Sequence, residues 1–274
     1  MRNDNWDLIL FLIIATVATI VWGRINRIGY SRFITSIVHF IMKYSKMNAE
    51  LIRSYLVLFI YMFVGLAAAV GLLLAYHVNL LRFLPLDPRY CMLVPLAFIA
   101  QNSLTGLMMQ LLIVAKPMMN VLLELTSVPW VKYTLIMPGV MRVISPLGAA
   151  IFEEVFFRGA VFLVLIHRFP QTGAYLPIFV CTALFIVHQA LQTDTLGQGL
   201  IMLIGSTSIS VVGCVITLYT GSFLPTLLCH TAYAFFYLQL GTSTNWRSLG
   251  SLPAMPISIP RIQRSKSSSA YPEF

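Results

Sequence analysis

The sequence predicts an all-α integral membrane protein, a bundle of about seven or eight transmembrane helices. Hydrophobic residues make up 58% of the chain and charged residues only 10%, whereas an ordinary soluble domain carries about 25% charged residues. The mean hydropathy is +0.84, and several apolar runs exceed the roughly 18 residues that a membrane-spanning helix needs. So little charge cannot cover the surface of a water-soluble globule of this size, which excludes that class.

Apolar segments that can span a bilayer follow one another along the chain. They lie near 8–24, 54–78, 91–115, 145–166, 174–194, 199–219 and 222–240. The stretch 117–143 is less apolar and contains several prolines, so it is an interfacial helix, a re-entrant segment or an eighth span. The stretch 33–47 has apolar residues at helical spacing beside Lys43 and Lys46, which predicts a helix on the membrane surface.

Three regions follow from this pattern. Residues 1–144 are expected to form N-terminal transmembrane helices and interfacial segments, and residues 145–240 a helix bundle that carries the charged motif described below. Residues 241–274 are rich in Ser and Pro and basic, which predicts a disordered tail. The first apolar run lacks a small-residue cleavage site and is preceded by Asp4 and Asp7, so we interpret it as a retained helix and not a signal peptide.

The basic residues predict the orientation in the membrane. With seven spans, thirteen Lys and Arg residues fall on one side: Arg24, Arg27, Arg32, Lys43, Lys46, Arg53, Lys116, Lys132, Arg142, Arg247, Arg261, Arg264 and Lys266. Four fall on the other: Arg2, Arg82, Arg89 and Arg168. We therefore expect the N-terminus outside and the C-terminus in the cytoplasm. The net charge of +9 then reflects topology and contact with membrane lipids, not nucleic acid.

Four cysteines lie in apolar runs without a CxxC pair: Cys91, Cys181, Cys214 and Cys229. This pattern favours buried, unreactive thiols over a disulfide framework or a zinc knuckle.

The strongest functional signal is the sequence Glu153-Glu154-Val155-Phe156-Phe157-Arg158 within an otherwise apolar span. A charge near the centre of a span costs about 2.5–3.5 kcal/mol on insertion scales, so intramembrane charges indicate partners and function. Glu154 and Arg158 are four residues apart, with Glu on the N-terminal side, which favours an ion pair on one helix face. Glu153 points about 100° away on the helix and lacks this cation, so it can accept a proton from water as a general base. The alternative is a purely structural cluster of all three charges.

Two histidines lie deep in later spans. His188 follows Ala-Leu-Phe-Ile-Val, and His230 follows Pro-Thr-Leu-Leu-Cys. A single histidine in a helix is usually a packing residue, but two histidines near an intramembrane Glu-Glu pair can activate a water and stabilise an oxyanion.

Together these motifs resemble the CPBP family of intramembrane endopeptidases, the CAAX protease and bacteriocin-processing family, also called Abi. The resemblance rests on Glu-Glu-x-x-x-Arg in one span, a histidine in the next and Thr220-Gly221-Ser222 before Pro225 and His230. It covers roughly residues 145–240, and it implies specific roles. Glu153 would activate water with help from His188, His230 would contribute to the oxyanion site, and Glu154 with Arg158 would hold the arrangement.

The resemblance implies a glutamate mechanism without a metal cofactor, and the sequence has no HExxH zinc helix. Glu153, His188 and His230 could still supply three ligands to zinc, so zinc stays an open alternative.

Two positions depart from the family pattern. The family's second motif usually has Phe four residues before its histidine, where this chain has Leu184, with Phe185 next. The third motif usually has Asn four residues after its histidine, where this chain has Ala234. Tyr233 is the tentative substitute for the missing amide donor; the other interpretation is an aromatic residue that lines the span.

The predicted function is therefore an intramembrane endopeptidase. It would use a glutamate-activated water to hydrolyse a peptide bond in a membrane-associated, lipidated or leader peptide or protein. The main alternative is a non-proteolytic membrane protein on the same fold, such as an immunity protein or scaffold. A transporter would also place charges in the bilayer, but the sequence shows no internal repeat.

Overall fold

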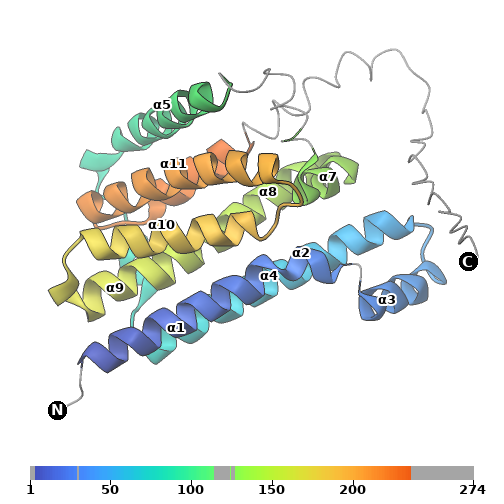
Figure 1. Cartoon of the computed structure of the whole chain (residues 1–274), viewed down its shortest axis with the longest axis horizontal. Coiled ribbons are helices and arrows are strands. Elements are labelled where there is room, and N and C mark those ends of the chain that lie inside the picture. Colours follow the sequence, from blue (N-terminus) through green and yellow to red (C-terminus); the bar gives the residue numbers. More distant parts are fainter. Residues whose placement is uncertain (1–3, 30, 114–123, 125–126, 236–274) are drawn as a thin grey trace, which may run out of the picture.

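The computed structural model of the chain describes residues 4–29, 31–113, 124 and 127–235 (Figure 1). These residues form helices joined by short turns, with no strand among them, which confirms the predicted all-α class. The expectation for the 241–274 tail falls outside the described residues, and of the 117–143 stretch the structure describes 124 and 127–143.

The N-terminal half begins with α1 (Asp4–Gly23) and the short α2 (Ile25–Ile28). The next helix, α3 (Arg32–Met42), packs Ile34 and Val38 against Ile52 of α4 (Ala49–Ala75). Ser31 and Asn48 cap the starts of these two helices by accepting hydrogen bonds from backbone N–H groups. The amphipathic helix predicted within 33–47 is therefore present, and its outer face exposes Phe33 and Phe40.

Two 3₁₀ turns, η1 (Leu80–Phe83) and η2 (Pro88–Tyr90), lead into α5 (Leu93–Ile113). The remaining elements are α7 (Pro129–Ile136), α8 (Gly139–Glu154), η3 (Val155–Phe162), α9 (Leu163–Arg168), η4 (Pro170–Thr172), α10 (Tyr175–Ala190), α11 (Leu196–Thr220) and a last helix from 224 that is described to 235. Gly221 ends α11 with a φ of 67°, a left-handed conformation that glycine adopts without strain.

Residues 139–168 run without a break through α8, η3 and α9, and their middle segment η3 is a π-helix. The N–H of Leu163 donates to the carbonyl of Arg158, five residues earlier, instead of the four of an α-helix. The sequence analysis assumed regular α-helix across 145–166. The π-helical segment starts directly after Glu154, and such segments often occur at functional sites.

The bundle is arranged with α5 at one edge and the α1–α4 pair at the other (Figure 1). Between them lie α11, α10 and the α8–η3–α9 rod, and α1 contacts α10 while α4 contacts η3. The main core cluster combines Phe11 and Trp22 of α1 with Phe156 and Phe157 of η3 and Phe185 of α10. The N-terminal helices thus pack directly on the 145–240 region.

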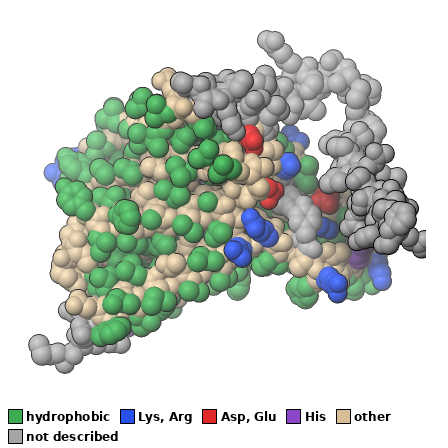
Figure 2. Space-filling model, viewed as in Figure 1, with side chains coloured by type: hydrophobic (Ala, Val, Ile, Leu, Met, Phe, Trp, Pro, Cys, Tyr) green, Lys and Arg blue, Asp and Glu red, His purple; other side chains and the backbone are tan. Residues whose placement is uncertain are grey.

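Within the described part of the chain, four helical segments are long and apolar enough to cross a membrane: Asn5–Ile28, Ala49–Ala75, Pro88–Leu112 and Leu196–Thr220. The helix Tyr175–Ala190 is apolar but shorter. Exposed hydrophobic side chains cover the flank of the bundle, as a lipid-facing surface requires (Figure 2). The total of seven or eight spans stays a prediction.

Basic side chains gather at the end of the bundle that carries α3 and α7 (Figure 2). The described cations at this end are Arg24, Arg27, Arg32, Lys43, Lys46, Arg53, Lys132 and Arg142. Arg82, Arg89 and Arg168 lie at the opposite end. We refer to the first as the basic end.

Candidate active site

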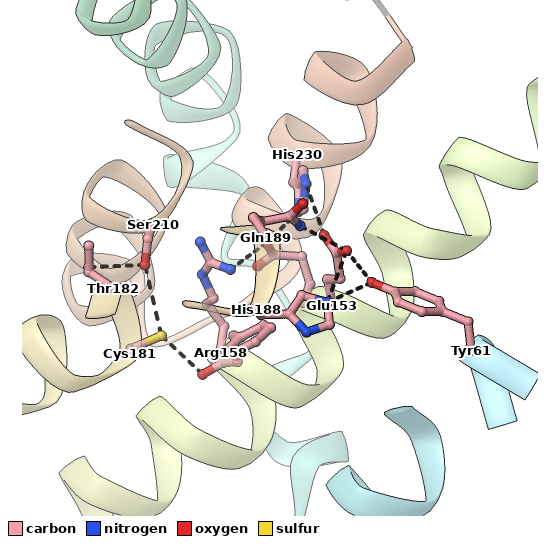
Figure 3. Close-up of polar contacts among 11 residues, drawn as sticks. Tyr61, Glu153, Arg158, Cys181, Thr182, His188, Gln189, Ser210 and His230 are labelled. Atoms are coloured by element: carbon pink, nitrogen blue, oxygen red, sulfur yellow. Dashed lines mark hydrogen bonds and ion pairs between the residues drawn. The ribbon is translucent and has the colours of Figure 1, made fainter. Parts of the chain in front are cut away.

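Glu153, the last residue but one of α8, lies at the centre of a buried polar group (Figure 3). Its two carboxylate oxygens have different environments. Oε1 accepts hydrogen bonds from the Tyr61 hydroxyl and from Nε2 of Gln189, the latter at 3.0 Å. Oε2 faces His230, whose Nε2 is 3.6 Å away. One oxygen is therefore held by two donors, while the other is directed toward a histidine.

His188 approaches Glu153 through Tyr61. Its Nε2 is 2.7 Å from the Tyr61 oxygen and 3.6 Å from Glu153 Oε1. The ring is completely buried and packs on Trp22, with ring centroids 4.4 Å apart. The structure thus brings the predicted pair Glu153 and His188 together, with a tyrosine hydroxyl bonded to both.

His230 is held by the second glutamate. Its Nδ1 lies 2.7 Å from Glu154 Oε1, and the same oxygen is 3.0 Å from Nη1 of Arg158. The predicted Glu154–Arg158 ion pair is therefore present, and both side chains are completely buried. A carboxylate that binds Nδ1 orients the imidazole and leaves Nε2 for chemistry, and here Nε2 points toward Glu153.

Aromatic residues enclose this ion pair. The Arg158 guanidinium lies over the ring of Phe185, 4.7 Å from its centroid, in cation–π geometry. Phe185 also meets His230 edge-on, with centroids 5.7 Å apart. Leu184, at the position where the family pattern has Phe, is buried too, so the aromatic contact with the site comes from the neighbouring position.

A cavity of about 140 Å³ reaches Glu153 and His230 from the basic end of the bundle. Its walls are mainly apolar and come from α4, α7, α8, α11 and the last helix; they include Trp130, Val131 and Met202. A group bound in this cavity would meet the Glu153 carboxylate among mainly apolar side chains.

Tyr233 and Ala234 both line this cavity next to His230. The Tyr233 hydroxyl is 3.1 Å from the Thr105 hydroxyl of α5, and it lies close to Gly205 of α11. This hydrogen bond joins the last helix to α5, and the role of Tyr233 as an oxyanion donor stays a prediction.

The sequence analysis did not identify Tyr61, Trp22 or Gln189 as site residues. Tyr61 is 92 residues from Glu153 and 127 from His188, so no local pattern could connect them. Gln189 had a usable signal, because a polar side chain next to an intramembrane histidine is itself a candidate functional residue.

No group of three His, Cys, Asp or Glu side chains in the described part of the chain is arranged to hold a metal ion. Nε2 of His188, a potential ligand atom, lies against the Tyr61 oxygen instead. The described side chains therefore do not fit the zinc alternative.

Cysteines take no part in this centre. Cys181, Cys214 and Cys229 are buried free thiols, as predicted. The same prediction for Cys91 is wrong, because this residue lies exposed in the turn before α5.

A family model described as type II CAAX prenyl endopeptidase Rce1-like matches residues 136–236. This finding confirms the family resemblance drawn from the motifs. A search of curated proteins and a search of solved structures each found no significant match. The matched segment contains Glu153, His188 and His230, whereas Trp22 and Tyr61 lie outside it.

Proposed function

Because residues 136–236 belong to the type II CAAX prenyl endopeptidase Rce1-like family, we propose that the chain is an intramembrane endopeptidase in which Glu153 activates the attacking water. The observation that carries this proposal is the asymmetry of the Glu153 carboxylate. Oε1 is engaged by Tyr61 and Gln189, whereas Oε2 faces His230 in a cavity with apolar walls. An oxygen in this position can accept a proton from water.

Hydrolysis would proceed in two steps. Glu153 Oε2 takes a proton from water while the oxygen of that water attacks the carbonyl carbon of the peptide bond. The carbonyl oxygen becomes an oxyanion, and a protonated His230 donates its Nε2–H to it while Nδ1–H stays bonded to Glu154. Collapse of this intermediate breaks the C–N bond, and Glu153 returns its proton to the departing amine.

The substrate class follows from the cavity and the family. Apolar walls suit a substrate that enters from the lipid phase or carries an apolar group. We propose a membrane-associated peptide with a lipidated C-terminus or a leader segment. The cavity extends from Glu153 to Asn26 and Trp130 near the basic end, which the positive-inside rule assigns to the cytoplasm, so we propose that the cleavage site is reached from that side.

Two assays test the proposal with matched variants. In the native host, wild type is compared with Glu153→Gln and with Glu50→Gln, the same exchange at an exposed position at the start of α4. Mass spectrometry of membrane and secreted peptides should reveal a peptide that stays uncleaved only with Glu153→Gln. In liposomes, the purified chain is given a farnesylated CAAX-terminated peptide and, in parallel, the same peptide without the farnesyl group. The comparison shows whether cleavage requires the lipid group on the substrate.

Equal peptide profiles for wild type and Glu153→Gln, at equal abundance in the membrane, would contradict the peptidase proposal. They would favour a non-proteolytic scaffold or immunity protein on the same fold. One observation points that way: Ala234 lines the cavity where the family pattern has an amide donor, and loss of one oxyanion donor lowers kcat by about 10²–10³-fold.

A further inference from the structure

Two aromatic residues from the N-terminal helices complete the site, although neither lies in the family-matched segment. Tyr61 belongs to α4 and Trp22 to α1. Both are buried, with exposed fractions of 4% and 0%. Trp22 donates its indole N–H to the backbone carbonyl of Tyr61 at 2.8 Å, and the two rings lie 4.9 Å apart.

We propose that Tyr61 is a positioning residue for peptide hydrolysis: its hydroxyl links Glu153 to His188, and Trp22 fixes both Tyr61 and the His188 ring. This inference rests on the proposed function and deepens it. It assigns to α1 and α4 a part of the reaction that the matched segment alone cannot supply.

The hydrogen bonds around the Tyr61 oxygen favour one direction. A carboxylate only accepts hydrogen bonds, so the Tyr61 O–H donates to Glu153 Oε1. The Tyr61 oxygen can then accept from His188 Nε2–H at 2.7 Å. In this arrangement His188 orients the Tyr61 hydroxyl, and the hydroxyl orients Glu153. The carboxylate is thereby fixed in the rotation that presents Oε2 to the cavity.

Gln189 supplies the second donor to the same oxygen, so removal of the Tyr61 hydroxyl leaves the carboxylate in place but held by one donor instead of two. Charge-assisted hydrogen bonds of this kind are stronger than neutral ones, and more so in a dry interior. The expected consequence is a loss of rate and not a loss of substrate binding.

A glycine on α4 makes room for Trp22. Gly65 lies one turn after Tyr61, and a Cβ atom at this position would come within 2.3 Å of the Trp22 ring. Gly71, further along the same helix, has no neighbouring heavy atom within 4 Å of such a Cβ. A glycine-to-alanine exchange at Gly65 should therefore displace Trp22, whereas the same exchange at Gly71 should not.

The kinetic test uses the full chain in liposomes, and its substrate is the farnesylated CAAX-terminated peptide or a peptide that the host comparison identifies. Tyr61→Phe keeps the ring and should lower kcat by about 10- to 100-fold, leave KM within about twofold and move the acid limb of the pH–rate profile. Tyr55→Phe on the same helix should match wild type. A kcat for Tyr61→Phe within twofold of wild type, with an unchanged profile, would overturn the inference.

The Trp22 contact is tested by Gly65→Ala against Gly71→Ala. Displacement of Trp22 should lower kcat for Gly65→Ala, whereas Gly71→Ala should match wild type. Equal kcat values for the two variants would remove Trp22 from the proposal.

A double-mutant cycle in thermal stability needs no substrate, so it tests the Tyr61–Glu153 link independently of the proposed peptidase activity. Thermal unfolding in detergent is measured for wild type, Tyr61→Phe, Glu153→Gln and the double variant. If Tyr61 holds the carboxylate, the two shifts in Tm are not additive; additive shifts would overturn the inference even in an active enzyme. Coupled shifts in a chain that cleaves no peptide would instead refute the proposed function while keeping the Tyr61–Glu153 link.

Discussion

Arg158→Met should destabilise the protein strongly, because it leaves Glu154 charged and buried without its cation. Both side chains have an exposed fraction of 0%, and Nη1 of Arg158 is 3.0 Å from Glu154 Oε1. Removal of one partner of a buried ion pair costs about 3–5 kcal/mol, whereas replacement of both by neutral groups of similar volume is often close to neutral. Met is an unbranched apolar side chain, so it replaces the aliphatic part of Arg158 and removes the charged guanidinium that lies over the Phe185 ring.

The double variant Glu154→Gln/Arg158→Met should therefore recover at least about 2 kcal/mol of the stability that Arg158→Met loses. Unfolding free energies in mixed micelles measure this recovery. The double variant should fold and still cleave peptide poorly, because His230 loses the carboxylate on Nδ1. Additive effects of the two exchanges on stability would refute the reasoning, since they would mean that the two charges do not depend on one another.

Two further predictions use other parts of the chain. Gly213→Ala should cost about 1–3 kcal/mol of stability, because its Cβ would come within 2.8 Å of the Thr226 hydroxyl and 3.3 Å of Arg158 Nε. The control is Gly106→Ala, because a Cβ there meets open space. Equal unfolding free energies of the two variants would contradict the described packing around Gly213. A membrane-impermeant maleimide added to intact cells should label wild type and not Cys91→Ser, because Cys91 is exposed at the end that the predicted orientation places outside. Labelling of Cys91 only after the membrane is opened would reverse the orientation.

The charged residues and histidines of the candidate site could be predicted from the sequence. Intramembrane charges are costly enough that Glu153, Glu154 and Arg158 could be singled out as candidate site residues from their position in an apolar span. The four-residue spacing predicted the ion pair, which the structure contains. The two histidines were identified by the same argument and both lie beside the glutamates.

Three features could not be derived from the sequence. The contacts of Tyr61 with Glu153 and His188 depend on how α4 packs against η3, and hydrophobic periodicity says nothing about which apolar helices become neighbours. The π-helical turn after Glu154 has no proline or other local signal for its position. Cys91 was expected to be buried because its flanking residues are apolar, yet it lies in a turn on the surface.

Span number was the least secure part of the fold prediction. The apolar run 174–194 is long enough for a span, but the helix there covers only Tyr175–Ala190, because residues 191–195 form the turn that leads into α11. The rod from 139 to 168 carries Glu154 and Arg158 in its middle, and these charges lower its mean hydropathy. The two residues pair with each other inside the protein and do not face lipid. Composition alone cannot tell an internally paired charge from one that faces lipid.

The most direct test of the account is the rate of peptide cleavage by purified chain in liposomes, compared among wild type, Glu153→Gln and Glu50→Gln. The substrate is the peptide that accumulates with Glu153→Gln in the host, or the farnesylated CAAX-terminated peptide. The account predicts that wild type and Glu50→Gln cleave at equal rates, while Glu153→Gln, compared at an equal amount of folded protein, loses at least about 10³-fold in kcat. Cleavage by Glu153→Gln within tenfold of wild type would contradict the assignment of Glu153 as the base that activates water.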